Sequence, residues 1–275
     1  MKHCIIGSEG FISKRHRKAI ENIGGELVLT CDNKDLNYID PDFRITPDFT
    51  DWVEMIHSPK FKEVGMISVC TPNYLHSVMV RECLRLGKKV LCEKPLTIFD
   101  DLHLEDPNLG VVLQLRHNPL VKKLKEENYS GNIKIEVASY RPPEYFESWK
   151  GQTPKSGGIV YNMGIHYLDL LIHLLGNPVS IPYSKISDKK AEFTIEFQRG
   201  IGEASIELLT VEAPVVRKIA LGGEFVDLEG ATIPLTDSGE VLDLHTEVYK
   251  DFIQGKRIGL REAKRSLDLA KHLCS

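Results

Sequence analysis

A strand–helix–strand unit in the first half of the chain constrains the fold more than any other feature. Residues 66–70 are typical of a buried strand, residues 74–86 have a helical pattern, and residues 87–91 read as a turn into a second strand. A right-handed crossover places both strand ends on one edge of a parallel sheet, where open α/β sheets bind ligands. The second strand ends at Cys92-Glu93-Lys94-Pro95. The sequence therefore predicts a lysine at a ligand-binding edge, where it can move a proton or stabilise an alkoxide.

Composition narrows the class of protein. The chain has 275 residues, of which 42% are hydrophobic, which is enough for one large domain or two ordinary ones. The formal net charge is −4, and this argues against a general nucleic-acid binder because neutralising phosphates requires a basic face. A local basic pocket for an anionic small substrate is compatible with this charge.

The sequence shows no targeting or metal-binding pattern. It contains no run of about 18 apolar residues, so no membrane-spanning helix is predicted, and Met1–Gly7 reads as a strand rather than a signal peptide. The six cysteines show no C-x-x-C spacing, so we interpret them as reduced, small hydrophobic residues. We expect a cytoplasmic protein with no metal site and no contact with a membrane.

The pattern of predicted secondary structure changes near Arg116. The first part alternates strands and helices, which predicts a doubly wound parallel sheet covered on both faces. The second part has successive alternating runs separated by turn signals, which predicts an α+β domain with an open, mainly antiparallel sheet. The predicted domains are 1–116 and 117–275. The predicted strands are 2–6, 26–31, 66–70, 90–92, 111–115, 133–140, 191–198, 201–209, 215–221 and 224–228, and the predicted helices are 11–23, 48–58, 74–86, 118–128, 157–175, 244–254 and 260–273.

A glycine-containing turn follows the first predicted strand. A dinucleotide fingerprint has the pattern G-x-G-x-x-G, but in Gly7-Ser8-Glu9-Gly10-Phe11-Ile12 only the first glycine is in register. A simple tight turn is therefore an equal alternative, and Glu9 has to point away from any phosphate. Asp32, after the second strand, can accept a hydrogen bond from a ribose hydroxyl, with Asp35 as a nearby competitor. No arginine stands at that strand end, which favours NAD over NADP.

Two further turns lie at the predicted ligand edge. In Cys70-Thr71-Pro72-Asn73, the polar residues bracket a proline just before a helix, which is a helix start and also a candidate cofactor contact. His76, one turn into that helix, is either structural or functional. Pro95 can adopt the cis form. For Lys94 the alternative is a solvated surface lysine.

Polar side chains also mark the second part. Asn162, His166, Asp169 and His173 recur at spacings of three and four, so they share one face of an apolar helix. Such a row is costly to bury unless it faces water, a partner or a ligand. Arg116 ends the last predicted parallel strand, where it can clamp a carboxylate or phosphate through two hydrogen bonds.

At this point the motifs resemble one family. Thr71-Pro72-Asn73-x-x-His76, then Gly87 to Pro95, then Gly157-Gly158 leading to Gly164-x-His166-x-x-Asp169 are similar to the Gfo/Idh/MocA oxidoreductases. The resemblance implies an N-terminal NAD(P)-binding Rossmann domain and a C-terminal α+β domain whose open sheet builds homodimers or homotetramers. It also implies that Lys94 and His166 are the catalytic pair and that Pro95 shapes the nicotinamide site.

A narrower likeness concerns Leu113 to His117, Ser148 to Gly151 and Asp243 to Thr246. These resemble bacterial 3-dehydrogenases that oxidise UDP-N-acetyl-glucosaminuronic acid for surface polysaccharide. Asn162 stands where many family members have aspartate, as in that subgroup. One departure is the segment from Leu96 to Gly110, where the family normally places a full helix.

The reaction expected from this resemblance is hydride transfer from a sugar secondary alcohol to NAD, with a nucleotide sugar as substrate. His166 accepts the hydroxyl proton and Lys94 stabilises the negative charge, or the roles are reversed. The alternatives are another sugar or polyol dehydrogenase and a nucleotide-binding member without activity. The expected substrate ligands are Arg116, His117, Trp149, Lys150, Asn162 and Asp169. The expected cofactor ligands are Gly7, Ser8, Gly10, Phe11, Ile12, Asp32, Cys70, Thr71, Pro72, Asn73, His76, Glu93, Lys94 and Pro95.

Overall fold

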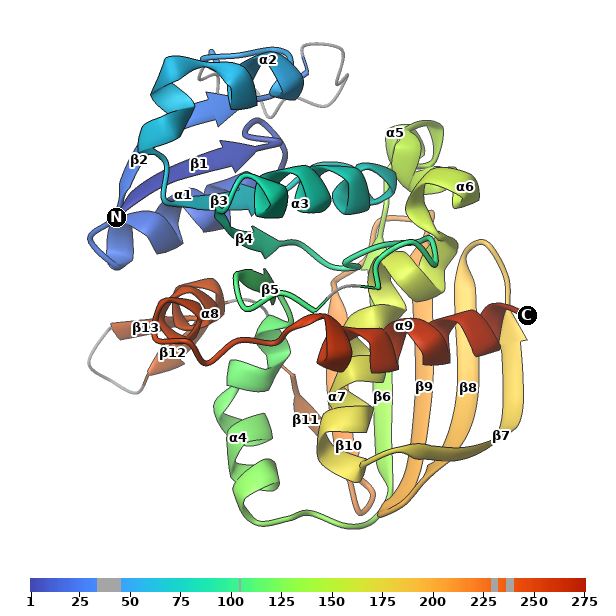
Figure 1. The fold of residues 1–275 in the computed structure, drawn as a ribbon. Coiled ribbons are helices and arrows are strands. Elements are labelled where there is room, and N and C mark those ends of the chain that lie inside the picture. The colour runs from blue at the N-terminus through green and yellow to red at the C-terminus, as the bar shows by residue number, and fades with distance from the viewer. Residues whose placement is uncertain (34–45, 104, 229–231, 236–239) are drawn as a thin grey trace. The chain divides into compact units, whose positions relative to one another are not determined.

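The chain folds into two compact units, each built from two segments of sequence. The structure is a computed structural model that describes residues 1–33, 46–103, 105–228, 232–235 and 240–275. The N-terminal unit comprises Met1–Val112 and His245–Arg261, and the C-terminal unit comprises Leu113–Leu244 and Glu262–Ser275. Figure 1 labels the elements of both units. How the cofactor and substrate roles divide between residues 1–116 and 117–275 stays a prediction.

A five-stranded parallel sheet forms the centre of the N-terminal unit. Its strand order is β2-β1-β3-β4-β5, and a parallel bridge between Cys31 and Phe49 continues it beyond β2. The order reverses between β1 and β3, so the crevice outside those two strand ends is the expected ligand position. This confirms the predicted doubly wound sheet. The strands are β1 (Lys2–Ile6), β2 (Glu26–Cys31), β3 (Met66–Val69), β4 (Lys89–Cys92) and β5 (Leu109–Val111).

Helices from both ends of the sequence complete this unit. The α8 helix contributes Val248, Tyr249 and Phe252 to a buried apolar cluster. That cluster also contains Ile5 and Met66 from the central strands. The second sequence segment is therefore part of the core and not an appendage. The helices are α1 (Ser13–Asn22), α2 (Trp52–His57), α3 (His76–Arg85) and α8 (Leu244–Ile253), with short 3-10 turns η1 (Pro59–Glu63) and η2 (Asn73–Leu75).

The prediction for the fifth strand was displaced along the sequence. The ladder pairs Leu109 and Val111 with β4, whereas residues 114–117 form a 3-10 turn, η3. Val112 and Leu113 are buried as well, so the apolar run extends past the end of the ladder. Hydrophobicity alone therefore placed the strand two residues too late.

The C-terminal unit contains a six-stranded sheet of order β11-β10-β6-β9-β8-β7. Its pairs are antiparallel except for β6 with β9, which are parallel. The mostly antiparallel sheet was predicted, but its edge strand β7 was not, since that strand is exposed along most of its length. The strands are β6 (Ile133–Tyr140), β7 (Pro178–Ile186), β8 (Lys190–Phe197), β9 (Gly200–Leu209), β10 (Val216–Leu221) and β11 (Glu224–Asp227), with a separate hairpin β12 (Thr232–Leu235) and β13 (Glu240–Asp243).

An apolar helix packs on this sheet. A Cβ atom at Gly202 of β9 would lie 2.9 Å from the Leu171 side chain of α7, so the helix packs closely on this strand. The run Thr153–Leu175 is long and apolar enough to cross a membrane by composition, but 67% of its most apolar window is buried inside the protein, as in a core helix. The helices are α4 (Pro119–Glu126), α5 (Pro143–Glu147), α6 (Thr153–Ser156), α7 (Ile165–Leu175) and α9 (Leu260–Cys274), with the 3-10 turn η4 (Trp149–Gly151) and the π-helical turn η5 (Val160–Gly164).

Candidate functional site

The turn after β1 is locked by its own backbone. Gly7 has φ of +84° and lies so close to β3 that a Cβ atom there would be 2.6 Å from the Cys70 carbonyl carbon. Its N–H and that of Ser8 both donate to the carbonyl of Cys31, at 2.8 and 3.1 Å. The first glycine of the predicted fingerprint is therefore required by the packing of one strand end against another. A Cβ atom at Gly10 would make only ordinary contacts, the nearest at 3.5 Å from the Gly7 carbonyl oxygen.

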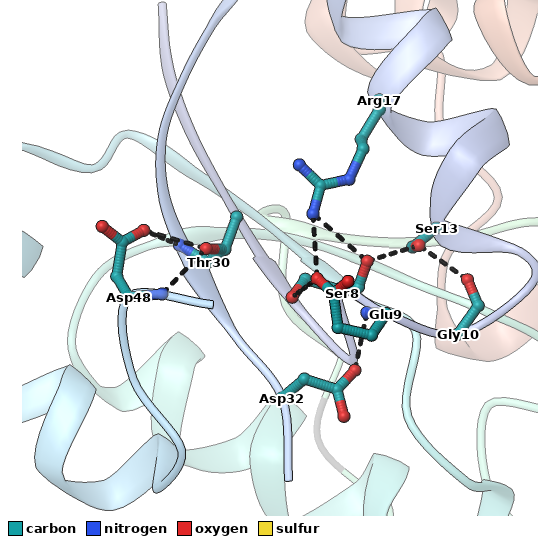
Figure 2. A network of polar contacts seen from close by, with 8 residues as sticks. All are labelled: Ser8, Glu9, Gly10, Ser13, Arg17, Thr30, Asp32 and Asp48. Atoms are coloured by element: carbon teal, nitrogen blue, oxygen red, sulfur yellow. Dashed lines mark hydrogen bonds and ion pairs between the residues drawn. The ribbon is translucent and has the colours of Figure 1, made fainter. Parts of the chain in front are cut away.

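Glu9 turns back toward the protein, as the sequence required. Its carboxylate accepts hydrogen bonds from the Ser8 hydroxyl at 2.8 Å and from Arg17 at 3.3 Å. Arg17 also donates to the Ser8 carbonyl at 3.2 Å, and Figure 2 shows these residues around the turn. The guanidinium thus neutralises a carboxylate that would otherwise repel an anionic ligand.

Asp32 joins the end of β2 to this turn. One carboxylate oxygen, Oδ2, accepts the Glu9 backbone N–H at 2.7 Å (Figure 2). The other oxygen, Oδ1, is buried and has no hydrogen-bond partner within the part of the chain that the structure describes. Burial raises the pKa of this carboxyl to about 6, against the backbone N–H groups of Glu9 and Asn33 and the charge of Arg17. The competing Asp35 lies outside the described residues.

His76 links the two other turns of the predicted cofactor edge. Its Nδ1 lies 2.7 Å from the Pro95 carbonyl oxygen and its Nε2 lies 2.8 Å from that of Thr71. The Lys94–Pro95 peptide bond is cis. Full burial lowers the pKa of His76, against the two carbonyl oxygens, which favour the charged ring. The histidine is therefore a bridge inside the protein, and Thr71 and Pro95 are brought together by it.

Glu93, an expected cofactor ligand, has its side chain turned into the N-terminal unit. Its side chain is 6% exposed and turns inward, where His16 Nε2 lies 3.0 Å from Oε1. The other oxygen accepts the Lys94 backbone N–H at 3.2 Å. A buried carboxylate has to be paired or hydrogen-bonded, and here protein groups fill that need. Lys94, the next residue, is half-buried.

A cavity of about 510 Å³ lies in the C-terminal unit, within the size range of small-ligand sites. Three cations in its lining lie over aromatic rings: Arg141 and Lys150 over Tyr145, at 5.2 and 5.6 Å, and Lys189 over Phe146 at 5.1 Å. Burial, with the charge of Arg141, lowers the pKa of Lys150. Glu147 and Asp188 also line the cavity, so three cations and two carboxylates leave a formal charge of +1. The partly desolvated cations suit an anionic ligand.

Of the expected substrate ligands, Lys150 and Asn162 line this cavity. The Asn162 side chain donates to the Tyr145 hydroxyl at 2.8 Å. Trp149 lies beside it, with its ring 5.9 Å from the Lys150 ammonium. Arg141, Tyr145 and Lys189 were not predicted, although Arg141 directly follows an alternating strand and so had a visible signal.

The predicted polar row on the long helix is divided between different partners. Residues 160–164 form a π-helical turn before α7 begins, and the wider turn changes how Asn162 is rotated relative to Asp169. Asn162 faces the cavity, whereas Asp169 is 2% exposed and buried in an ion pair. His166 is half-buried on α7 in the C-terminal unit, and Lys94 belongs to the N-terminal unit. Their pairing stays a prediction.

Arg116 binds carboxylates of its own unit in place of the expected substrate carboxylate. Its guanidinium donates to both oxygens of Asp169, at 2.9 and 2.7 Å, and to Glu262 at 3.0 Å. These carboxylates raise the pKa of Arg116 further, although burial opposes them. Both Arg116 and Asp169 were expected to be substrate ligands, and in the structure they bind each other. The nearby His117 is buried within η3.

The N-terminal residues fit a dinucleotide. The free oxygen of Asp32 suits a ribose hydroxyl. The first turn of α1 carries no acidic residue, and helix N-termini leave backbone N–H groups for a phosphate. The N–H groups of Gly7 and Ser8 donate to the Cys31 carbonyl, that of Glu9 donates to Asp32, and that of Gly10 donates to the Gly7 carbonyl. The expected phosphate contacts of Phe11 and Ile12, the next two residues, stay predictions.

Comparisons with protein families agree with this arrangement. Residues 1–107 match the NAD-binding Rossmann fold of the Gfo/Idh/MocA oxidoreductase family, and residues 130–208 match the C-terminal alpha/beta domain of the same family. Among curated relatives, the scyllo-inositol 2-dehydrogenase (NADP(+)) of Bacillus subtilis is 26% identical over 180 residues, covering 61% of this chain and 48% of that protein. The chain spans about half the length of the curated relatives it matches.

Solved structures align over the whole chain. The WlbA (WbpB) dehydrogenase of Thermus thermophilus, in complex with NAD and UDP-GlcNAcA, is 27% identical with a TM-score of 0.80, covering 100% of this chain and 95% of that chain. The WlbA dehydrogenase of Bordetella pertussis, in complex with NADH and UDP-GlcNAcA, is 23% identical with a TM-score of 0.72, covering 100% and 95%. The second likeness shows the fold alone.

Proposed function

Because the chain belongs to the Gfo/Idh/MocA oxidoreductase family, we propose that it oxidises a secondary alcohol of a sugar with NAD. The proposed substrate is a UDP-linked N-acetyl-hexosaminuronic acid, which is oxidised at its 3-hydroxyl. The observation that carries this proposal is the full-length likeness to a dehydrogenase solved with NAD and UDP-GlcNAcA. The cation-lined cavity of the C-terminal unit supports it, since such a substrate carries a carboxylate and a diphosphate.

The cofactor would be held by the turn after β1 and by Asp32. Bound NAD supplies the hydride acceptor. The Asp32 carboxylate accepts a hydrogen bond from a ribose hydroxyl, and its negative charge disfavours the 2′-phosphate of NADP. Phe11 and Ile12 offer backbone N–H groups at the start of α1.

Lys94 and His166 are assigned the proton chemistry at the oxidised carbon. His166 accepts the hydroxyl proton as a general base. The Lys94 ammonium stabilises negative charge on that oxygen as it develops. The reverse assignment, with Lys94 as the base, is the alternative. The two assignments predict different pH profiles, because substituting the residue that acts as the base removes its ionisation from the dependence of kcat/KM on pH.

Arg141 and Lys150 are assigned to the acidic groups of the substrate. Each lies against the Tyr145 ring, which holds the cation in a partly desolvated position where its charge is screened less by water. Asn162, bonded to the same tyrosine, offers an amide to the sugar. This proposal assigns no substrate contact to Arg116 or Asp169.

The direct test incubates the protein with NAD and UDP-GlcNAcA and follows the absorbance of reduced nicotinamide. Lys94→Ala should lower turnover by about 10²–10⁴-fold while NAD still binds. Lys150→Ala should raise KM for the nucleotide sugar by about tenfold or more, because it removes a charged hydrogen-bond donor. Lys123→Ala is the matched control, since this exposed lysine of α4 in the same unit pairs with Glu127 at the end of that helix.

The outcome is decided by two comparison substrates. UDP-GlcNAc lacks the carboxylate and should be a poor substrate if the cations read that group. Oxidation of free myo- or scyllo-inositol without oxidation of the nucleotide sugar would reject the proposed substrate in favour of a polyol dehydrogenase, which the Bacillus relative makes a specific alternative. Unchanged turnover in Lys94→Ala would reject the assigned role of that lysine.

A further inference from the structure

A hydrogen-bonded chain runs through the interior of the N-terminal unit and ends at the backbone of Lys94. It starts with the Ser68 hydroxyl, which is bonded to the Tyr249 hydroxyl. Tyr249 then lies 2.8 Å from His16 Nδ1, and His16 Nε2 lies 3.0 Å from Glu93 Oε1. Glu93 Oε2 finally accepts the Lys94 N–H at 3.2 Å. Four elements, β3, α8, α1 and the end of β4, are joined by this chain.

Its side chains are enclosed. His16 and Tyr249 are 0% exposed and Glu93 is 6% exposed. A second imidazole, that of His245, lies 3.6 Å from Glu93 Oε1 and packs edge-on against His16 at 5.6 Å between ring centroids. Burial opposes ionisation of Glu93, but the hydrogen bond with His16 and the charges of the two histidines hold its pKa well below the ordinary range. The carboxylate is therefore an anion in a dry interior, held between imidazoles.

Ordering such a cluster has a cost that a simple apolar core would avoid. Buried ion pairs gain little net stability over well-packed hydrophobic residues. The cluster therefore calls for a role besides stability, and its position supplies one, because Glu93 directly precedes Lys94. Fixing both oxygens of Glu93 fixes the peptide that carries the lysine side chain. Small displacements of a reacting group are expensive, at about 10²-fold for 1 Å.

We propose that Glu93, His16 and Tyr249 are positioning residues that hold the Lys94 backbone in place from inside the N-terminal unit. This inference rests on the proposed function, in which Lys94 acts on the substrate. The same three ligand atoms of His16, Glu93 and His245 lie within 4.8 Å of one another, so a divalent metal is the rival explanation that the test has to address.

The test compares three variants of the full-length protein. Tyr249→Phe removes one hydroxyl from the chain and keeps the ring, and Glu93→Gln keeps the shape and removes the charge. Thr246→Val is the matched control. This buried threonine of α8 accepts a hydrogen bond from Asn22 at 2.9 Å, and neither residue belongs to the hydrogen-bonded series from Ser68 to Lys94. Three measurements are made for each variant: steady-state kinetics with NAD and UDP-GlcNAcA, which give kcat and KM, the dissociation constant for NAD, and the amide hydrogen-exchange rate of Lys94 by NMR.

A positioning role predicts a particular split. Turnover should fall about 10-fold in Tyr249→Phe and about 100-fold in Glu93→Gln, while KM and NAD binding stay within about threefold. The Lys94 amide should exchange at least about tenfold faster in both variants. Thr246→Val should match the wild type in all three measurements. A purely structural role would instead lower the amount of folded protein without changing the kcat of what remains.

Failure of this inference is separable from failure of the proposed function. If Lys94→Ala is inactive while both chain variants keep wild-type kcat and Lys94 exchange, the positioning role is overturned and the function stands. If the wild type does not oxidise UDP-GlcNAcA with NAD, the proposed function fails, and the exchange rates still decide whether the hydrogen-bonded series holds the Lys94 backbone. If Lys94→Ala is fully active, only the catalytic role of Lys94 fails. If Glu93→Gln does not fold, Tyr249→Phe carries the decision. One equivalent of divalent metal in the purified protein, lost in His245→Asn, would overturn the hydrogen-bonded account.

Discussion

Two clusters of buried charged side chains, one in each unit, are built differently. In the N-terminal unit, Glu93 lies between two histidines, and its second oxygen is bonded to the backbone of Lys94. In the C-terminal unit, Arg116 lies between Asp169 and Glu262, which belong to α7 and α9. The first cluster leads to a residue assigned to chemistry, and the second ties three structural elements together.

This difference teaches that a buried charge is not evidence of a site. Arg116 was expected to clamp a ligand because it follows a predicted strand, yet two of its N–H groups donate to the two oxygens of Asp169. We therefore expect the two clusters to respond to substitution in opposite ways. The C-terminal cluster should control stability, and the N-terminal cluster should control turnover.

The largest effect is expected for Asp169→Ala. This change leaves Arg116 buried with only the half-exposed Glu262 as a partner, and breaking a buried pair costs about 3–5 kcal/mol in the free energy of unfolding. Urea denaturation measures it. Asp268→Ala, which breaks an exposed pair with Lys264 on α9, is the control and should change stability by less than about 1 kcal/mol. Equal effects of the two substitutions would remove the distinction between buried and surface pairs.

A pH effect is expected from His3, whose ring is buried 6.1 Å from the Tyr249 ring of the N-terminal cluster. Burial, with the positive N-terminus, lowers the pKa of His3 from 6.5 to about 4. Between these values the unfolded chain binds more protons, so this contribution to stability is lost as pH falls from about 6.5 to about 4 and amounts to about 3 kcal/mol.

His3→Leu should remove that dependence. Its free energy of unfolding should fall by about 3 kcal/mol less than that of the wild type between pH 6.5 and pH 4. The comparison of slopes matters, because Asp32, whose pKa is raised to about 6, contributes with the opposite sign in the wild type and in the variant alike. Identical slopes would show that the imidazole of His3 is not held neutral by burial.

Paired amide substitutions should separate the two clusters by activity. Glu93→Gln is expected to lower kcat by about 100-fold, equivalent to about 2.7 kcal/mol. Asp169→Asn, the same chemical change in the other cluster, should leave the kcat of the folded protein within about twofold while lowering its unfolding midpoint. Steady-state kinetics on samples of known folded fraction measure both. A loss of kcat in Asp169→Asn as large as in Glu93→Gln would erase the proposed division of roles.

The smallest effect is expected for Glu262→Gln. This carboxylate is 46% exposed in its side chain, so water screens its interaction with Arg116, and the loss should be below about 1 kcal/mol. Thermal or urea denaturation of this variant and of Asp169→Ala compares the free energy of unfolding that each carboxylate contributes. A loss as large as that of Asp169→Ala would show that the exposed Glu262 stabilises the protein as much as the buried Asp169.

The fold was largely readable from the sequence, for reasons that lie in local pattern. The strands 2–6, 26–31 and 133–140 were predicted with their observed bounds, because each is an apolar or alternating run between clear turns. The edge strand β7 had no such signal, since it buries little. Nor did the sequence indicate that α8 returns to the first unit, because a helix pattern shows which face is apolar but not which core receives it.

The candidate site was predictable where a motif fixes the backbone. The cis bond before Pro95 and the inward turn of Glu9 were both anticipated. The partners of Glu93 were not, because His16 and Tyr249 are separated from it by 77 residues and 156 residues of chain. Side chains that meet only through tertiary packing leave no trace in local spacing. The cavity lining at Lys189 was missed for the same reason, whereas Arg141, which directly follows an alternating strand, had a visible signal.

The return of α8 to the first unit has a consequence for how the protein is made. Tyr249 and His245 are synthesised after the whole second sheet, so a growing polypeptide on the ribosome contains Glu93 and His16 long before their neighbours exist. The corner that carries Lys94 therefore acquires its final surroundings only near the end of translation. A shortened gene product ending before α8 would leave the first unit with an open apolar core, which is a surface that chaperones and proteases recognise.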